Sequence, residues 1–391
     1  MERIGIFGGT FDPPHMGHIQ SAQQAIAALN LDRLLMIPTH TPPHKQAAQT
    51  PPHHRLQMLR LAVAGIPGAE VSDMELRREG VSYTYETLEQ VRAMYPDAEI
   101  FLLMGSDMFL SFHNWKCPER ILSQATLAVF YRGGKGEMSK VEEKKHQLEA
   151  EGHRIHLIKN KVLEISSTQL RRMLAFHCAD EFLPDGVGDY ICRHGLYHVH
   201  ADWKNLPMEQ LEPVVISLLK PNRVAHVLGC RDTAARLAKI WGVDETDAAR
   251  AGMLHDITKA LDGPLQLTLC REYGKILSDF SRKYPKTLHA LTGSLVAERI
   301  FGENAAVVAA IESHTTGKAA MNMLEKIIYV ADYMEPNRDF PGVEQLRHLA
   351  ETDMDAALKL GLEITLAHLA RLGDEVSPES REALEYLNVK V

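Results

Sequence analysis

Two histidines near the N-terminus follow a glycine pair at a spacing that suits chemistry on a phosphate. Gly8 and Gly9 come directly after the short apolar run 4–7, and His15 and His18 follow, three residues apart. Glycines let a backbone approach a phosphate closely, and the spacing puts both imidazoles on one face if a helix begins near His15. The amides of its first turn would point at the same place. These residues therefore predict a pocket for a phosphate that gains negative charge in a transition state.

The string from Gly8 to His18 resembles the (H/T)-x-G-H signature of the nucleotidyltransferase superfamily. In that family a substrate phosphate attacks the α-phosphate of ATP, and pyrophosphate leaves. The resemblance implies that His15 and His18 are catalytic. It also implies a set of nucleotide-binding residues directly after the first strand: Gly8, Gly9, Thr10 and Phe11.

A second signature of the same superfamily is expected late in the domain, and residues 165–171 resemble it. Serine and threonine side chains there can cap a helix whose amides face the leaving phosphates. Arg171, one turn into that helix, can clamp the oxygens of pyrophosphate and is implied to be catalytic. The residues of this signature that are implied to bind the nucleotide are Ile165, Ser166, Ser167 and Thr168.

The middle of this region resembles nicotinate-nucleotide adenylyltransferase specifically, through residues 42–45, 82–88 and 105–107, and so does its end, 187–197. The resemblance covers essentially all of residues 1–197. It implies that the N-terminal region joins ATP and nicotinate mononucleotide into deamido-NAD, with release of pyrophosphate. Phosphopantetheine adenylyltransferase is the nearest alternative.

The same resemblance assigns the acceptor subsite. Trp115 is implied to stack on the pyridine ring, the backbone at Thr84 to hold the carboxylate, and Lys45 to approach a phosphate. Gly105 and Asp107 are implied to contact the adenosine. The pantetheine enzyme usually has threonine where His15 stands, and its substrate would not require this tryptophan. Mg²⁺ bridging the phosphate oxygens of ATP is expected on general grounds.

Six potential metal ligands are spread over the C-terminal half, and each lies on or at the end of a segment with helical apolar spacing. They are His226, His255, Asp256, His289, His314 and Asp332. A buried carboxylate without a partner is costly, and a metal ion beside neutral imidazoles removes that cost. Mixed nitrogen and oxygen ligands suit iron, manganese, cobalt or zinc, and six ligands exceed a tetrahedral zinc site.

The order H…HD…H…H…D resembles the HD phosphohydrolase superfamily. The resemblance implies two metal ions, with iron as the favoured metal and with Asp256 as a catalytic, bridging ligand. His226, His255, Asp256 and Asp332 would hold the first ion, and His289 and His314 would complete the second site with Asp256. Two neighbouring ions could activate water for attack on phosphorus.

Local strings around these ligands resemble the symmetrical diadenosine tetraphosphate hydrolase of the HD type, from about residue 207 to residue 350. The resemblance implies hydrolysis of diadenosine tetraphosphate to two ADP. Lys259, Lys318 and Arg338 are then natural phosphate clamps. Two alternatives stay open: hydrolysis of another nucleotide polyphosphate, or a regulatory module that binds a nucleotide without turnover.

The elements that position these residues differ between the two halves. Apolar runs at 4–7, 34–37, 99–104, 128–131 and 155–158 predict strands, and they alternate with segments of helical spacing. This alternation predicts a Rossmann-like parallel α/β sheet of the nucleotidyltransferase type, with ligands at the carboxyl ends of its strands.

The C-terminal half shows only helical spacing and predicts an all-α HD domain. Its expected helices are 211–219, 234–241, 248–259, 288–300, 305–312, 324–334 and 354–372. We therefore expect an adenylyltransferase domain over 1–197, a linker over 198–206, and an HD phosphohydrolase over 207–391.

Composition excludes several classes of protein. The chain has 391 residues, 45% of them hydrophobic, and a net charge of −8. This balance is typical of a globular protein and argues against broad contact with nucleic acid. No apolar run approaches the roughly 20 residues of a membrane helix. Five scattered cysteines without a C-x-x-C pair, and no signal peptide, predict a cytoplasmic enzyme. The oligomeric state stays open.

Overall fold

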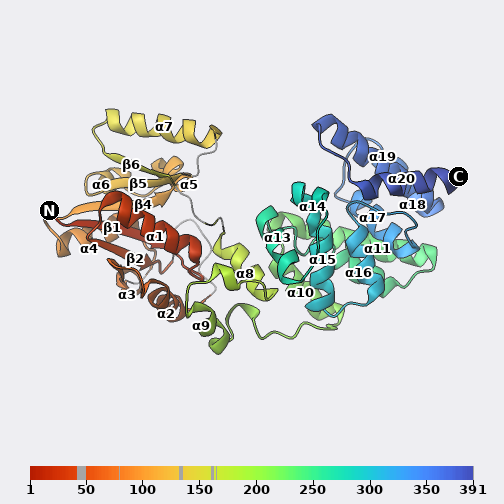
Figure 1. Cartoon of the computed structure of the whole chain (residues 1–391), viewed down its shortest axis with the longest axis horizontal. Helices are drawn as coiled ribbons and strands as arrows, with labels where there is room; N and C mark the ends of the chain where they lie inside the picture. The colour runs from red at the N-terminus through yellow and green to blue at the C-terminus, as the bar shows by residue number, and fades with distance from the viewer. Residues whose placement is uncertain (42–49, 79, 132–134, 160–162, 164, 391) are drawn as a thin grey trace. The chain divides into compact units, whose positions relative to one another are not determined.

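The computed structural model describes residues 1–41, 50–78, 80–131, 135–159, 163 and 165–390. Lys45, a predicted phosphate-binding residue, lies outside these ranges. The chain divides into two compact units, Met1–His200 and Ala201–Val391 (Figure 1). The division falls within 198–206, where the sequence predicts the linker. Trp203, in this stretch, is buried and stacks face to face on Phe301 of the second unit, with ring centroids 5.8 Å apart.

The first unit is built on a six-stranded sheet in which every strand pair is parallel. Its strands are β1 (Arg3–Gly9), β2 (Arg33–Pro38), β3 (Ala69–Val71), β4 (Glu99–Gly105), β5 (Thr126–Tyr131) and β6 (Ile155–Lys159), in the order β3-β2-β1-β4-β5-β6. The predicted Rossmann-like α/β class is confirmed. The sequence pattern gave no signal for β3, which is only three residues long.

Helices cover both faces of this sheet. They are α1 (Met16–Leu29), α2 (Pro52–Val63), α3 (Met74–Arg77), α4 (Thr84–Met94), α5 (Ser106–Leu110), α6 (Pro118–Leu122), α7 (Lys135–Ala150), α8 (Ser167–Ala175) and α9 (Val187–His194), with the 3₁₀ turns η1 (Phe112–Asn114), η2 (Asp180–Phe182) and η3 (Leu196–His198). Alternate strand residues, such as Ile4 and Ile6, join one core with α4 to α7. Figure 1 shows α1 across the other face. Burial on both faces explains why the strands are continuous apolar runs.

The strand order reverses direction between β1 and β4. The register pairs Ile6 with Leu102, so Gly9 and Gly105 end adjacent strands at the same edge of the sheet. In open parallel sheets, ligands bind outside the carboxyl ends of the strands at this reversal. The fold therefore brings the first motif and the residues after β4 to one candidate site.

The second unit consists of helices, and no strand occurs in the part of it that the structure describes. The helices are α10 (Met208–Leu218), α11 (Val224–Trp241), α12 (Glu245–Leu254), α13 (Gly263–Glu272), α14 (Asp279–Lys283), α15 (Leu288–Arg299), α16 (Ala305–Ser313), α17 (Met323–Met334), α18 (Val343–Thr352), α19 (Met354–Leu372) and α20 (Pro378–Lys390), with turns η4 (Pro221–Arg223) and η5 (Pro285–Thr287). The predicted all-α class is confirmed. Among the described residues of either unit, no helix is long and apolar enough to cross a membrane.

Helices α11, α12, α16 and α17 pack against one another, and their core is aliphatic. The approach of α12 to α11 is close at Gly252. A Cβ added there would lie 2.8 Å from the Cα atom of Arg231 and 3.0 Å from its backbone nitrogen. Because the obstacle is backbone, it cannot rotate away. Helix α11 carries His226, and His255 directly follows α12. Gly252 therefore lets the segments of both histidines come together.

We predict that Gly252→Ala lowers the free energy of unfolding of the second unit by about 1–3 kcal/mol, because the added methyl must force the helices apart. The measurement is urea unfolding followed by tryptophan fluorescence in a Trp115→Phe background. In that background, Trp203 and Trp241 are the remaining tryptophans, and both lie in the second unit.

Gly361→Ala is the matched control, since Gly361 also lies inside a helix of the second unit, α19. A Cβ there would meet the ring edge of Tyr329 at 3.2 Å, and a ring can shift more easily than backbone. Its destabilisation should be the smaller of the two. An unchanged unfolding midpoint for Gly252→Ala would contradict the close-approach argument.

Candidate functional site

His15 and His18 lie together at the start of α1. His15 is the N-cap residue, and the two rings stack with centroids 3.6 Å apart and an interplanar angle of 28°. The backbone N–H of His15 donates to Nδ1 of His18 over 3.2 Å. Because Nδ1 of His18 accepts, a neutral His18 ring carries its proton on Nε2. His18 is therefore set up as a hydrogen-bond donor.

Burial sets the charge of His15. Its side chain is only 5% exposed, and burial lowers its pKa to about 4. Near neutral pH the ring is therefore uncharged. Gly17 separates the two histidines, and a Cβ there would lie 2.8 Å from the carbonyl oxygen of Leu163. The glycine of the motif thus lets the segment before α8 approach the start of α1.

The second predicted motif meets the first one in space. Ser166 caps α8, and its hydroxyl accepts from the N–H of Gln169. Ser167 donates from Oγ to the carbonyl oxygen of Pro13 over 3.0 Å. Arg171 donates from Nη1 to the carbonyl oxygen of Asp12 over 2.7 Å. The two motifs are more than 150 residues apart in the chain, yet they meet at the carboxyl end of β1. The amino ends of α1 and α8 lie there together.

Arg55 is a residue that the sequence reading missed. Its guanidinium is buried and donates to three carbonyl oxygens, those of Thr10 at 2.7 Å, Thr39 at 2.9 Å and Thr50 at 3.2 Å. Burial lowers its pKa, yet arginine stays charged in proteins. Arg55 thereby ties the loop after β1 to the loop after β2. An arginine at a helix start carries no local sign of such a role, because its partners come from distant segments.

A buried carboxylate completes this network. Asp12 accepts from the hydroxyl of Tyr197 over 2.7 Å, and the guanidinium of Arg171 lies 4.0 Å from it. Burial, followed by the charge of Asp12, raises the pKa of Tyr197 above its usual range, so its proton stays in place. The predicted pyrophosphate clamp, Arg171, is therefore held by the backbone and side chain of Asp12.

The remaining predicted residues of the first unit occupy separate positions. Gly105 is the N-cap of α5, and a Cβ there would lie 2.7 Å from Oδ1 of Asp107. Thr84 begins α4. Trp115 is half-buried, packs on the core and meets Phe112 with ring centroids 5.4 Å apart. The assignment of Thr84 and Trp115 to the acceptor subsite stays a prediction.

In the second unit, the four predicted histidine ligands all have the same tautomer. Nδ1 of His255 lies 2.8 Å from the carbonyl oxygen of Gly252, Nδ1 of His289 lies 2.8 Å from that of Lys286, and Nδ1 of His314 lies 2.7 Å from that of Ile311. Nδ1 of His226 lies 3.1 Å from the carboxylate of Glu335. Because carbonyl and carboxylate oxygens only accept, each Nδ1 carries the proton. Every Nε2 therefore presents a lone pair.

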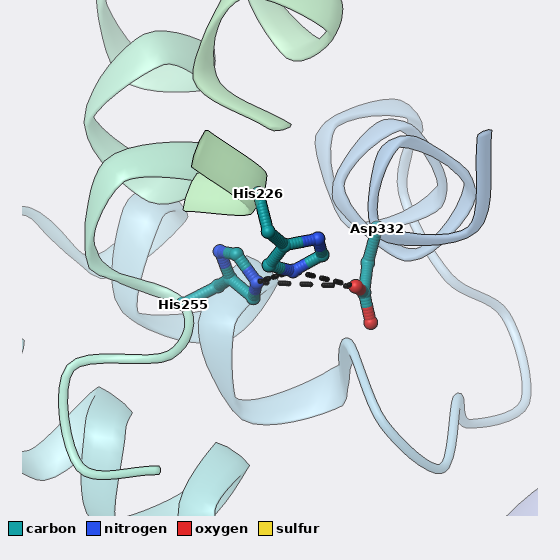
Figure 2. Close-up of side chains that lie close together, drawn as sticks. All are labelled: His226, His255 and Asp332. Atoms are coloured by element: carbon teal, nitrogen blue, oxygen red, sulfur yellow. Dashed lines mark hydrogen bonds and ion pairs between the residues drawn. The ribbon is translucent and has the colours of Figure 1, made fainter. Parts of the chain in front are cut away.

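Two of these Nε2 atoms, from His226 and His255, meet a carboxylate oxygen of Asp332 (Figure 2). Nε2 of His226 lies 3.2 Å from Nε2 of His255 and 3.1 Å from Oδ1 of Asp332. Nε2 of His255 lies 4.0 Å from the same carboxylate oxygen. Burial raises the pKa of Asp332, and the charge of Arg338, whose guanidinium contacts the same oxygen, acts in the opposite direction. A neutral pair of imidazoles and a carboxylate offer only lone pairs, and a cation relieves their repulsion.

Asp256 is fully buried and lies between the two halves of the predicted centre. Its Oδ2 is 3.6 Å from Nε2 of His255 and 3.8 Å from Nε2 of His226. Its Oδ1 is 3.6 Å from Nε2 of His289 and 3.9 Å from Nε2 of His314. Each oxygen of one carboxylate therefore faces a different pair of imidazoles.

Among the residues that the structure describes, two groups of side chains have spacing suited to an ion: His226, His255 and Asp332, and His255, Asp256 and His314. His255 belongs to both groups, whereas the sequence analysis assigns it only to the first ion. His289 instead meets Lys259, whose Nζ lies 2.8 Å from Nε2. Burial lowers the pKa of Lys259 to about 8. The hydroxyl of Thr315, which the sequence reading did not single out, also lies 3.0 Å from this Nε2.

Cations surround the centre. Arg223, which the sequence reading missed, forms an ion pair with Oδ2 of Asp256. Arg338 donates from Nη2 to Oδ1 of Asp332 over 2.6 Å. Lys318, a predicted phosphate clamp, is half exposed and pairs with Glu325 at 2.6 Å. Arg223, Arg338 and Lys259 thus lie at the ligands, whereas the contact of Lys318 is with a residue outside the centre.

The fold and the two sites define a class of protein. The cytidylyltransferase-like family model matches residues 6–173, and the HD domain model matches residues 223–337. The first unit is therefore a nucleotidyltransferase fold, and the second unit contains an HD domain.

Comparison with known proteins identifies the family of the N-terminal unit. The chain is similar to the probable nicotinate-nucleotide adenylyltransferase of Gemmatimonas aurantiaca, at 39% identity over 50% of this chain and 92% of that protein. It is also 39% identical to the protein of that name in Desulfatibacillum aliphaticivorans, over 50% of this chain and 99% of that protein. A crystal structure from Clostridium acetobutylicum, titled a predicted HD superfamily hydrolase involved in NAD metabolism, is 36% identical over 48% of this chain and 99% of that chain, with a TM-score of 0.47. Through its N-terminal unit the chain belongs to the nicotinate-nucleotide adenylyltransferase family, as the sequence motifs predict.

We predict that acid destabilises the metal-free second unit. Burial holds the pKa of His314 to about 4 and those of His255 and His289 well below the usual value. An unfolded histidine titrates near 6.5, so unfolding takes up protons below that pH. Each such imidazole should cost up to about 1.4 kcal/mol per pH unit as pH falls from about 6.5 towards 4.

The measurement is urea unfolding in EDTA at pH 7.5, 6.5 and 5.5, with the Trp115→Phe chain. The stability contributed by neutral imidazoles is complete above about pH 6.5 and declines below it. His314→Gln cannot take up this proton, so its stability should fall less steeply with acid. Equal pH slopes for both chains would show that His314 titrates normally in the folded protein.

Proposed function

We propose that the N-terminal unit transfers the adenylyl group of ATP to nicotinate mononucleotide, giving deamido-NAD and pyrophosphate. Two findings support this: the family membership of the unit, and the convergence of both phosphate-binding motifs at the end of β1. The substrate phosphate is already a nucleophile, so no covalent intermediate on the protein is needed. The task of the site is positioning and electrostatic stabilisation.

The residues divide this task. Gly8 and Gly9, at the end of β1, would let the triphosphate approach the amino end of α1, where amides and imidazoles can bind it. The Nε2–H of His18 donates to the α-phosphate as its charge grows, and neutral His15 stacks on that ring and fixes it. The capped start of α8 and Arg171 receive the leaving pyrophosphate. Mg²⁺, when bound to ATP, neutralises part of the phosphate charge.

The acceptor is held by residues that only the family resemblance assigns. Trp115 would stack on the pyridine ring, and the backbone at Thr84 would bind its carboxylate. Lys45 would meet the phosphate of nicotinate mononucleotide. Trp115 fits this role in that it is partly exposed although it packs against the core.

We predict that His18→Ala lowers adenylyl transfer by roughly 10²–10³, because one preorganised donor to the developing charge is lost. The measurement is the rate of deamido-NAD formation. His18→Gln can place an N–H near the former Nε2 position and should retain more activity than His18→Asn, which is too short. Hydrolysis by the other unit should be unchanged. Near-normal synthesis by His18→Ala would remove this histidine from the mechanism.

We further propose that the C-terminal unit hydrolyses diadenosine tetraphosphate symmetrically to two ADP, with two divalent metal ions, iron being favoured. The observation that supports it best is the meeting of four Nε2 lone pairs and two carboxylates. The surrounding cations and the hydroxyl of Thr315 can donate to some of these acceptors, and the lone pairs of His226 and His255 face each other and the carboxylates. The donor set fits a divalent ion of the iron, manganese or cobalt type.

Each group has a role in this reaction. His226, His255 and Asp332 would hold one ion, and His289 and His314 would hold the other with Asp256 between them. When bound, such ions polarise phosphoryl oxygens and activate water. Arg223 and Arg338, which pair with the two carboxylates here, are within reach of a polyphosphate that approaches those ligands. Lys259 adds a third cation.

We predict that Asp256→Ala loses both ions, or retains one weakly, and abolishes hydrolysis, since its carboxylate is the group that faces both pairs of imidazoles. His289→Ala and His314→Ala should cost mainly the second ion. The measurements are metal content per chain and ADP formation from diadenosine tetraphosphate.

Adenylyl transfer by the same variants is the internal control, and it should be unchanged because the substitutions lie in the other unit. Full hydrolysis by the Asp256→Ala chain, or by the metal-free chain, would overturn the two-metal proposal.

A further inference from the structure

Glu335 is a fully buried carboxylate that directly contacts one predicted metal ligand. Its side chain follows α17 and reaches back to α11, where Oε1 accepts from Nδ1 of His226 over 3.1 Å. Its other oxygen, Oε2, accepts from the backbone N–H and from Nδ2 of Asn337, each over 2.8 Å. A buried carboxylate is costly unless its oxygens are satisfied. Both oxygens of Glu335 are satisfied by these contacts, which hold its side chain in place.

The packing on α11 makes room for this carboxylate. A Cβ at Gly229 would lie 2.5 Å from Oε2 of Glu335 and 3.3 Å from the side chain of Asn337. Gly229 lies one helical turn after His226 and therefore faces the same way. The glycine, the carboxylate and the amide thus form one built contact behind the His226 ring.

The other three histidines differ from His226 at Nδ1. His255, His289 and His314 each donate there to a neutral backbone carbonyl. An anionic acceptor draws more strongly on the Nδ1 proton and makes Nε2 a better electron-pair donor. Glu335 lies on the side of His226 away from Nε2, so it cannot replace a ligand and acts through the ring.

We propose that Glu335 is a positioning residue for the metal centre: it makes His226 the strongest imidazole ligand, so the group of His226, His255 and Asp332 holds its ion more tightly than the group around His289 and His314. The inference rests on the proposed metal centre. It adds which of the two sites binds its metal ion first, which the set of ligands alone does not predict.

The test is a titration of the metal-stripped full chain with Co²⁺, followed by visible absorption and by equilibrium dialysis with metal analysis. Wild type should bind in two steps of different affinity, and Asp332→Ala should lose the tighter one. Glu335→Gln should weaken that tighter step by roughly 10–100-fold and leave the weaker step in place. Asn337→Ala, which removes one side-chain donor to Glu335 and keeps its carboxylate, should have a smaller effect in the same direction.

Glu325→Gln is the matched control, because Glu325 is another buried carboxylate of α17 and contacts Lys318 instead of a ligand. It should leave both steps unchanged. A wild-type chain that binds no Co²⁺ would refute the metal centre itself. If the wild-type chain binds Co²⁺ in two steps and Glu335→Gln leaves the affinity of the tighter step unchanged, only the role of Glu335 is refuted. If Glu335→Gln fails to fold without metal, the Asn337→Ala titration decides, and no change there refutes the proposal.

Discussion

The atom that meets Nδ1 of His18, and of the four predicted histidine ligands of the HD domain, decides what each of these imidazoles can do. In the first unit a backbone N–H donates to Nδ1 of His18, so Nε2 keeps the proton. In the second unit carbonyl or carboxylate oxygens accept from Nδ1 of four histidines, so Nε2 keeps the lone pair. The first arrangement suits donation to a phosphate, and the second suits binding of a cation. The same type of side chain, histidine, is thus suited either to donate a hydrogen bond or to bind a cation, depending on the atom that contacts its Nδ1.

The second constraint is the repulsion between acceptors in the HD domain. Helices α11, α12, α15, α16 and α17 bring imidazoles and carboxylates from separate segments into one cluster, and burial keeps His255, His289 and His314 neutral near neutral pH. In the metal-free chain the neighbouring cations Arg223, Arg338 and Lys259 offset part of the resulting repulsion. The same cations lie where a polyphosphate would need positive charge. Under the proposed hydrolysis, the side chains that offset this repulsion would also bind the substrate.

The adenylyltransferase unit solves a different problem, because its site must stay open to ATP. The switch in strand order supplies the crevice, and the amino ends of α1 and α8 supply dipoles aimed at anions. A buried guanidinium, Arg55, with three carbonyl partners holds the loop after β1 to the loop after β2. Asp12 and Tyr197 join the same network, so the last residues of the unit help to fix the first motif.

The sequence alone determined the fold classes and five of the six strands, and it singled out two candidate phosphate motifs and six candidate ligands. Each depends on residues close in the chain or on a continuous apolar run. Only the tertiary structure revealed Arg55, Arg223 and Glu335, because their partners lie on distant segments and a single charged residue has no periodicity. The short β3 escaped for the related reason that three residues are too few for a pattern. The tautomers, and the position of Asp256 between two pairs of imidazoles, are decided by which atoms the packed helices bring within hydrogen-bonding distance.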